Sequence, residues 1–286
     1  MVNAKSIAAY IKIVRPVNVA ITGCAVALGI WLTGALPAIP FLALMAAAMA
    51  AAAYGNVIND ILDIGSDRVS HPNRPLADGT MTPRAAAVFA GILAASSIAF
   101  AATVSALYLT AALVPLILLT LYSIYFKRTR LIGNILVSAL TAYAIIFGAI
   151  PNPGVKILTL PAILAFLLNF CREIIKDIQD AAGDNAAGWT TSASLSPKTI
   201  RALLTGAAAA HILLIFAPSV IFGHFGMTYT AVCLTAVIPI HIYWTMLTLR
   251  SGIDKNAGRI ALALKLEMAA GLAALALDKS IYYFIR

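Results

Sequence analysis

The chain has 286 residues, of which 62% are hydrophobic and only 11% are charged. A soluble globular domain carries about 25% charged residues, so this composition excludes a soluble fold and indicates a helical protein that crosses a membrane several times. The net charge of +9 fits loops that face anionic lipid and an anionic substrate, and we expect no nucleic-acid partner.

Nine apolar segments are long enough to cross a bilayer as helices. In chain order they cover residues 16–36, 38–62, 84–105, 107–126, 131–150, 157–178, 200–222, 227–249 and 260–284. Most of the breaks between them are marked by Pro and Gly, as in Gly34 to Pro40, Pro72 to Pro83, Pro151 to Gly154, Pro218 to Gly226 and Ser251 to Gly258. The sequence therefore predicts an all-α polytopic membrane protein with nine transmembrane helices.

The basic residues are sorted to one side of this predicted topology. The N-terminus, the loops after helices two, four, six and eight, and the flanking helix ends hold 17 of the 20 Lys and Arg residues. Only Lys156, Lys279 and Arg286 fall on the other side. By the positive-inside rule, we expect a multi-pass protein of the cell membrane with a cytoplasmic N-terminus, cytoplasmic acidic loops and an outer C-terminus.

An acidic motif closes the second predicted helix. Polar residues recur there along three helical turns and fall largely on one face, namely Asn56, Asn59, Asp60, Asp63 and Asp67. Carboxylates held this close repel one another and would partly protonate unless a cation lies between them. Oxygen ligands of this kind suit Mg²⁺, which often completes its shell with substrate phosphates.

The same motif recurs at the end of the sixth predicted helix. Asp177, Asp180 and Asp184 repeat the spacing of the first motif at a constant offset of 117 residues, and the two motifs hold six of the eleven acidic residues. Ordinary solvated acids at two helix ends are the alternative. We predict instead that the motifs face each other and hold one or two Mg²⁺ ions with a diphosphate between them. The offset also suggests two related halves, 1–126 and 127–286.

Basic residues near the motifs are candidates for binding that diphosphate. Arg74 lies between Pro72 and Pro75, which restrict the backbone, and Lys127 lies where the fourth helix ends. The full set of candidates is Arg74, Lys127, Arg128 and Lys176. Alternatively, loop cations of this kind fix the topology and contact lipid headgroups.

Two tyrosines are candidates for the pocket of an allylic donor. Loss of an allylic diphosphate leaves a carbocation, which aromatic faces stabilise in a site closed to water. Tyr122 and Tyr143 lie near the expected active side or within helices that can line it. The alternative for each is anchoring at the membrane interface.

Other classes of site find less support. The spacing of the four histidines in the sequence is not that of metal ligands, and we interpret all of them as structural: His71, His211, His224 and His241. A transporter could also use paired acids, but it would place them near the midplane in broken helices. Because the motifs end their helices beside loops, an enzyme is favoured.

Four stretches give the chain a resemblance to a known family. They are NDILDIGSD (59–67), NRPLADG (73–79), YSIYFKRTRLIGN (122–134) and DIQDAAGD (177–184). Over nearly its whole length the chain resembles the UbiA superfamily of intramembrane prenyltransferases. The resemblance implies a single domain over residues 1–286, an all-α bundle around a central cavity, and Mg²⁺-dependent transfer from a polyprenyl diphosphate to an acceptor.

The resemblance also implies roles for individual residues. It assigns Mg²⁺ and diphosphate to Asn59, Asp63, Asp67, Asp180 and Asp184, of which the four aspartates are the catalytic candidates. Asp60 and Asp177 belong to the same motifs as further metal-ligand candidates. Arg74 and Lys127 would contact the diphosphate.

Within the family, REIIKDIQDAAGD (172–184) and RPVN (15–18) are similar to the archaeal branch that makes digeranylgeranylglyceryl phosphate. This similarity implies transfer of a geranylgeranyl group to geranylgeranylglyceryl phosphate, which forms the second ether bond of the archaeal membrane lipid. Acceptor-binding candidates are Arg15, Asn18, Asn56 and Arg172. Members of the family often have a basic segment and the residues TLP after the second motif, whereas this chain has NAAGWTTSASLSP there.

The alternative to this ether-lipid function is that of an aromatic polyprenyltransferase of quinone synthesis, such as one acting on 4-hydroxybenzoate.

Overall fold

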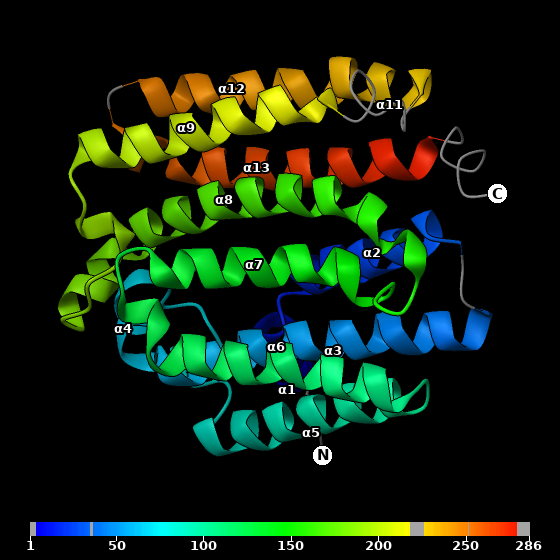
Figure 1. The fold of residues 1–286 in the computed structure, drawn as a ribbon. Coiled ribbons are helices and arrows are strands. Elements are labelled where there is room, and N and C mark those ends of the chain that lie inside the picture. Colours follow the sequence, from blue (N-terminus) through cyan, green and yellow to red (C-terminus); the bar gives the residue numbers. More distant parts are fainter. Residues whose placement is uncertain (1–3, 35–36, 218–225, 251, 279–286) are drawn as a thin grey trace. The chain divides into compact units, whose positions relative to one another are not determined.

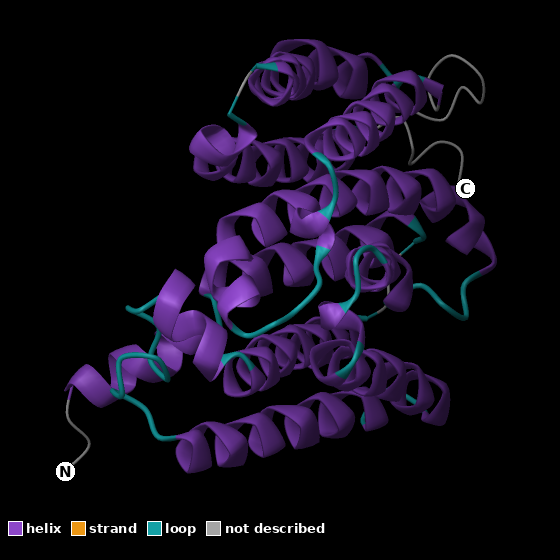
Figure 2. Cartoon of the chain, turned by 90° about the vertical axis from the view of Figure 1, so that its left-hand side faces the viewer, coloured by secondary structure: helices purple, strands orange, loops and turns teal. Residues whose placement is uncertain are grey.

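The structure is a computed structural model that describes residues 4–34, 37–217, 226–250 and 252–278. Every regular element that it describes is a helix (Figures 1 and 2). In chain order the elements are α1 (Ala4–Ile13), α2 (Pro16–Leu32), α3 (Ala38–Leu62), α4 (Ile64–Ser70), α5 (Pro83–Ala102), α6 (Ala106–Ile124), η1 (Phe126–Arg128), α7 (Ile132–Phe147), η2 (Pro153–Leu158), α8 (Thr159–Ala186), η3 (Ser192–Ser194), α9 (Pro197–Ile215), α11 (Met227–Val232), η4 (Cys233–Val237), α12 (Ile238–Leu249) and α13 (Ile253–Leu277). The predicted all-α class is confirmed.

The number of spans differs from the predicted nine. Among the described residues, seven helices are long and apolar enough to cross a membrane, and the bent pair Ile7–Ile13 and Pro16–Leu32 raises this to eight. All nine predicted segments contain a helix, but Ile132–Phe147 has only 16 residues. At 1.5 Å per residue this helix is about 24 Å long, shorter than the roughly 30 Å of the hydrocarbon core. The polytopic membrane fold is therefore confirmed, while the count of nine is not exact.

Several predicted boundaries fall outside the described residues. These are most of the break from Pro218 to Gly226, Ser251 in the following break, and the end of the ninth segment after residue 278. The last helix begins at Ile253, earlier than expected. Gly252, which adopts a positive φ of 79°, precedes it and allows the sharp turn into the helix.

The chain divides into two compact units. The first unit comprises residues 1–24, 37–136 and 180–191, and the second comprises 25–36, 137–179 and 192–286. Helix α8 passes from the second unit into the first at residue 180. The predicted derivation from two duplicated halves stays a prediction.

In the first unit, α3, α5 and α6 pack against one another. Sequence signals fix where two of them begin. Thr82 caps α5 by accepting a hydrogen bond from the Ala85 backbone N–H at 3.2 Å, and Pro83 follows it at the first helical position. Ser105 caps α6 in the same way. A small apolar core joins α1, α3, α5 and the loop between α4 and α5, and its buried members are Ala9, Ile13, Val57, Leu76, Met81, Ala86 and Ala90.

In the second unit, α12 packs against α9 and α13. Its core includes large buried side chains such as Trp244, Leu204 and Ile260. Another apolar cluster of buried residues contains parts of α2 and α7. The two helices approach closely there, because a Cβ on Gly29 would lie 1.8 Å from the carbonyl oxygen of Ile145. Small residues allow helix backbones to approach this closely within a membrane.

Candidate active site

The first acidic motif spans the break between α3 and α4. Helix α3 ends at Leu62, and Asp63, with φ −96° and ψ 1°, joins it directly to α4. Asn59, Asp60, Asp63 and Asp67 are all buried, with at most 4% of their surface exposed. Buried carboxylates are stable only with cations or hydrogen-bond donors beside them.

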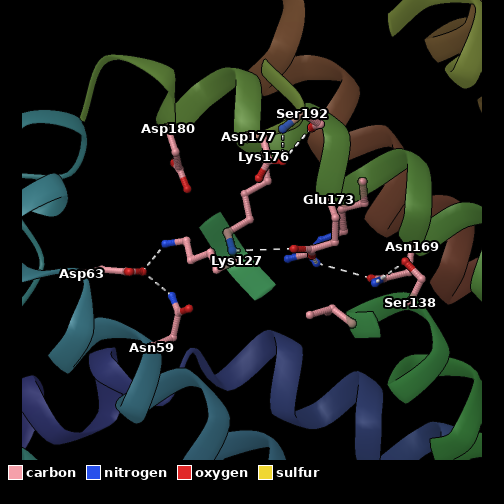
Figure 3. Close-up of polar contacts among 12 residues, drawn as sticks. Asn59, Asp63, Lys127, Ser138, Asn169, Glu173, Lys176, Asp177, Asp180 and Ser192 are labelled. Carbon is pink, nitrogen blue, oxygen red and sulfur yellow. Dashed lines mark hydrogen bonds and ion pairs between the residues drawn. The ribbon is translucent and has the colours of Figure 1, made fainter. Parts of the chain in front are cut away.

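Three cations from separate segments approach these carboxylates. Lys127, from η1, donates to Asp63 and is itself buried (Figure 3). Arg74 donates to Asp67 at 2.6 Å and lies 3.4 Å from Asp60. Arg15 pairs with Asp60 from the bend between α1 and α2, where its own φ is 53°. Arg74 is thus a nearby partner in the sequence, whereas Arg15 and Lys127 lie 45 and 64 residues from the carboxylates that they contact.

The end of α8 lies against α4 and carries the second acidic motif. Ser66 donates to Asp184 at 3.0 Å, and Ser70 donates to the backbone carbonyl of Asp180 at 3.0 Å. The backbone N–H of Gly183 donates to the Ser70 hydroxyl at 2.8 Å. A Cβ on Gly183 would lie 2.3 Å from the Ser66 carbonyl oxygen, so this contact depends on glycine. Asp180 and Asp184 thus belong to the same unit as Asp63 and Asp67.

Three buried oxygen atoms of the two motifs have no hydrogen-bond partner within the described part of the chain: Asn59 Oδ1, Asp63 Oδ1 and Asp184 Oδ2. Leaving a buried acceptor unsatisfied costs about 1–3 kcal/mol, and more when the group is charged. All three atoms are hard oxygen donors, the ligands that Mg²⁺ prefers. These residues therefore fit a magnesium ion.

The ion pair between Asp67 of α4 and Arg74 of the following loop is buried, and burial acts on the pKa of both groups. Burial raises the pKa of Asp67, and the neighbouring Asp60 and Asp63 raise it further, although Arg74 opposes them. For Arg74, burial opposes the charged form, but Asp60 and Asp67 outweigh it and raise its pKa. Arg74 therefore offsets only part of the effect that burial has on the pKa of Asp67.

Trp189 covers two of the predicted diphosphate ligands. Its ring centroid is 5.3 Å from Lys127 Nζ and 4.7 Å from the Arg128 guanidinium carbon, both within cation–π range. Gly188 has a φ of 71°, and the Trp189 backbone N–H donates to the Asp184 carbonyl at 2.9 Å. Trp189 was not predicted as a site residue, because its only signal in the sequence is its position just after the second motif.

Three of the histidines that were predicted to be structural have acidic partners in the structure. His71 follows Asp67 by one helical turn, and its Nε2 lies 2.6 Å from Asp180 Oδ1. His211 and His241 meet Glu267 in the second unit in an arrangement that could hold a metal ion. Local spacing could not reveal these contacts, since the partners come from different helices. His224 lies outside the described residues.

Some predicted residues of the first unit have other contacts. The Asn56 side chain donates to the Val14 carbonyl at 2.8 Å and thereby holds the bend between α1 and α2. Asn18 lies half-buried in the first turn of α2. Tyr122 is buried near Gly133, where an added Cβ would lie 3.1 Å from the tyrosine ring.

Four predicted residues belong to the second unit. Asp177 accepts hydrogen bonds from the Ser192 hydroxyl at 2.6 Å and from its backbone N–H at 3.2 Å (Figure 3). Arg172 and Lys176 both approach Glu173, at 2.6 and 3.7 Å. Tyr143 packs near Phe147, with ring centroids 5.9 Å apart. The metal, diphosphate, acceptor and prenyl-pocket roles of these four residues stay predictions.

Known proteins resemble this chain in sequence. The sequence model of the UbiA prenyltransferase family matches residues 20–265. The digeranylgeranylglyceryl phosphate synthase of Thermococcus gammatolerans is 34% identical over 266 residues, which cover 90% of this chain and 93% of the relative. The Methanopyrus kandleri synthase is 37% identical over 187 residues, 64% of this chain and 68% of that protein.

Solved structures share the fold. A structure concerning digeranylgeranylglyceryl phosphate synthase in membranes matches with a TM-score of 0.74 and 25% identity, over 97% of this chain and 99% of that chain. A UbiA homologue of Archaeoglobus fulgidus, bound to GPP and Mg²⁺, matches with a TM-score of 0.65 and 20% identity, over 94% of this chain and all of that chain.

Proposed function

This chain belongs to the UbiA prenyltransferase family, and we propose that it transfers a geranylgeranyl group from geranylgeranyl diphosphate to geranylgeranylglyceryl phosphate with Mg²⁺ as cofactor. The product is digeranylgeranylglyceryl phosphate, which carries the second ether bond of the archaeal membrane lipid. The observation that carries the donor chemistry is the set of unsatisfied oxygens on Asn59, Asp63 and Asp184. The relatives named as this synthase support the choice of acceptor.

Five residues of the two motifs are the proposed ligands: Asn59, Asp63, Asp67, Asp180 and Asp184. When bound there, Mg²⁺ neutralises charge on the diphosphate as its bond to carbon breaks. Ser66 positions the Asp184 carboxylate by donating to Oδ1, and this leaves the unsatisfied Oδ2 as the atom that could bind the ion. His71 orients Asp180 in the same sense.

Three cations are proposed to hold the diphosphate. The Lys127 ammonium group has three N–H donors, and one of them already bonds Asp63, so the same side chain can bridge this ligand and a phosphate oxygen. Arg74 is placed in the same way by Asp67. Arg128, stacked on Trp189, offers a planar set of donors suited to phosphate.

The transfer itself breaks one carbon–oxygen bond and forms another. The diphosphate leaves carbon 1 of the geranylgeranyl group, the acceptor hydroxyl oxygen bonds to that carbon, and the hydroxyl proton is released. Tyr122 and Tyr143 are proposed to face the developing cation. For the acceptor we propose Arg15, Asn18, Asn56 and Arg172. Since Arg15 is paired with Asp60, an acceptor phosphate would compete with that carboxylate.

We also propose that the protein lies in the cell membrane with its N-terminus and acidic motifs in the cytoplasm and its C-terminus outside. The distribution of Lys and Arg supports this orientation. Cytoplasmic placement would give the site access to phosphorylated metabolites. Cysteine labelling of the loops in intact cells would test it.

A transfer assay tests the proposed function. Purified protein in detergent, with Mg²⁺ and labelled geranylgeranyl diphosphate, would be offered geranylgeranylglyceryl phosphate or 4-hydroxybenzoate in parallel. We expect product from the lipid acceptor only, and product from the aromatic acceptor only would refute the proposal. Asp63→Asn should abolish transfer, whereas Asp254→Asn, a control at an exposed acid of α13, should not.

A further inference from the structure

A second polar cluster lies within the apolar helices of the second unit. Helix α9 contributes His211, α12 contributes His241, and α13 contributes Glu267. Their exposed fractions are 3%, 4% and 0%. Ionisable groups inside a membrane protein are costly, and they usually bind or transfer something. The proposed prenyl transfer uses none of the three.

One carboxylate oxygen faces both imidazoles. Glu267 Oε1 lies 2.7 Å from His241 Nδ1 and 3.5 Å from His211 Nδ1. The other oxygen, Oε2, accepts a hydrogen bond from the indole of Trp244, which fixes the orientation of the carboxylate. The two imidazole rings stack with centroids 5.3 Å apart. One donor atom from each of the three residues lies within 4.8 Å of the others.

Hydrogen bonding satisfies this cluster only in part. His241 Nδ1 and Glu267 Oε1 are within hydrogen-bond distance of each other. His211 Nδ1 is buried and, within the described residues, makes no hydrogen bond, although it points at the same oxygen. A cation coordinated by all three atoms would satisfy the unpaired nitrogen as well.

We propose that His211, His241 and Glu267 form a site for a divalent transition-metal ion of the zinc type. Two imidazole nitrogens and a carboxylate oxygen are donors typical of zinc, whereas Mg²⁺ prefers oxygen alone. Zinc bonds of about 2.0–2.2 Å in tetrahedral geometry place donor atoms roughly 3.3–3.6 Å apart. The His211–Glu267 distance already fits this range. Binding of the ion would replace the hydrogen bond between His241 Nδ1 and Oε1 with a metal bond, and the proton would then reside on Nε2 of the same ring, so that the imidazole stays a neutral ligand.

The ion would join three helices of the second unit at one point. Trp244 acts on the carboxylate and not on the metal, so it would be a positioning residue. Such an outer contact typically changes metal affinity by about 10- to 100-fold. The site differs from the magnesium site in donor type, and it can therefore be examined without measuring prenyl transfer.

Metal analysis of the full-length protein, purified without chelators and with any affinity tag removed, tests the proposal. We expect about one zinc per chain, and zinc-depleted protein should gain thermal stability when Zn²⁺ is added but not when Mg²⁺ is added. His211→Phe keeps a ring in place of the imidazole and leaves the Trp244 and His241 bonds to Glu267. It should lose both the zinc and the stability response. Trp244→Phe should weaken zinc binding about 10- to 100-fold.

His71→Phe, which removes a histidine from the other unit, is the matched control and should keep its zinc. Absence of zinc from the wild type together with no response to Zn²⁺ would overturn the proposal, as would full zinc retention by His211→Phe. If that variant does not fold, X-ray absorption of the zinc-loaded wild type decides. Nitrogen and oxygen ligands with imidazole scattering would support the site, and sulfur ligands would refute it.

Discussion

Gly183→Ala tests the contact between α4 and α8 on which the candidate active site depends. The added Cβ would lie 2.3 Å from the Ser66 carbonyl oxygen, 2.5 Å from the Ser70 hydroxyl and 2.7 Å from the Ser66 hydroxyl. Ordinary van der Waals contact begins at 3.4 Å, so the backbone of α4 must move by about 1 Å. Because Ser66 orients Asp184 and Ser70 bonds the Asp180 carbonyl, this movement separates the two acidic motifs.

Two opposing effects set the change in the free energy of unfolding that Gly183→Ala causes. Alanine is favoured over glycine inside a helix by about 1 kcal/mol. Overpacking a well-packed contact costs about 1–3 kcal/mol, and each lost hydrogen bond costs about 1 kcal/mol more. With both serine hydrogen bonds lost, we expect the free energy of unfolding to fall by about 2–4 kcal/mol. Because the same residues position the proposed metal ligands, Mg²⁺-dependent donor binding should weaken by about 10- to 100-fold.

Gly65→Ala is the matched control. It makes the same chemical change on the exposed side of α4, where no described atom lies within 4 Å of the added Cβ. Thermal unfolding in detergent and donor binding with Mg²⁺ would be measured for both variants. Wild-type stability and donor affinity in Gly183→Ala would refute the packing argument, as would equal damage by Gly65→Ala.

Three further predictions concern single side chains. Trp189→Leu removes cation–π contacts worth about 0.5–1 kcal/mol each, so kcat/KM for the donor should fall about fivefold or more; a change confined to the acceptor KM would contradict this. Burial raises the pKa of Asp67 above its ordinary value, so the folded protein binds this proton more tightly than the unfolded chain does, and the contribution of that proton to stability declines as pH rises through the raised pKa. The affinity for Mg²⁺ in donor binding should therefore fall as pH is lowered through a range above the ordinary value of 3.8, and a pH-independent affinity would exclude this competition. Asp177→Asn can still accept from Ser192, so it should keep far more transfer than Asp180→Asn; equal losses would support Asp177 as a metal ligand.

Much of the candidate site could be predicted because its information is local. The spacing of acids along a helix end follows from 3.6 residues per turn. Repetition of that spacing at the end of another apolar segment indicated that Asp63, Asp67, Asp180 and Asp184 act together. The structure places all four in one unit.

The contacts that support these acids could not be predicted in the same way. Ser66 and Asp184 are 118 residues apart, and Lys127 and Asp63 are 64 apart. Such pairs depend on how helices pack, which a periodic pattern does not specify. The His211 and His241 cluster was missed for the same reason, since each of its residues comes from a different helix.

The two motifs share their spacing, but their first aspartates contact different partners. Asp60 and Asp177 occupy the same position in their motifs, yet Asp60 pairs with two arginines while Asp177 accepts from Ser192. A repeated motif specifies the direction of a side chain relative to its own helix. The partner in that direction depends on the segments that pack there. Roles transferred by motif alignment are therefore most secure where both the spacing and the partner recur.

The charges around the first motif indicate why metal and diphosphate should enter together. Lys127, Arg74 and Arg15 already compensate Asp63, Asp67 and Asp60, while oxygens of Asn59, Asp63 and Asp184 stay unsatisfied among the described residues. A diphosphate alone would add negative charge to a buried cluster that already holds several carboxylates, and a metal alone would add uncompensated positive charge. Charges are stable in a low-dielectric interior only when they are paired. An Mg²⁺–diphosphate pair meets this condition, because the ion takes the unsatisfied oxygens and the diphosphate takes the cations already placed beside them.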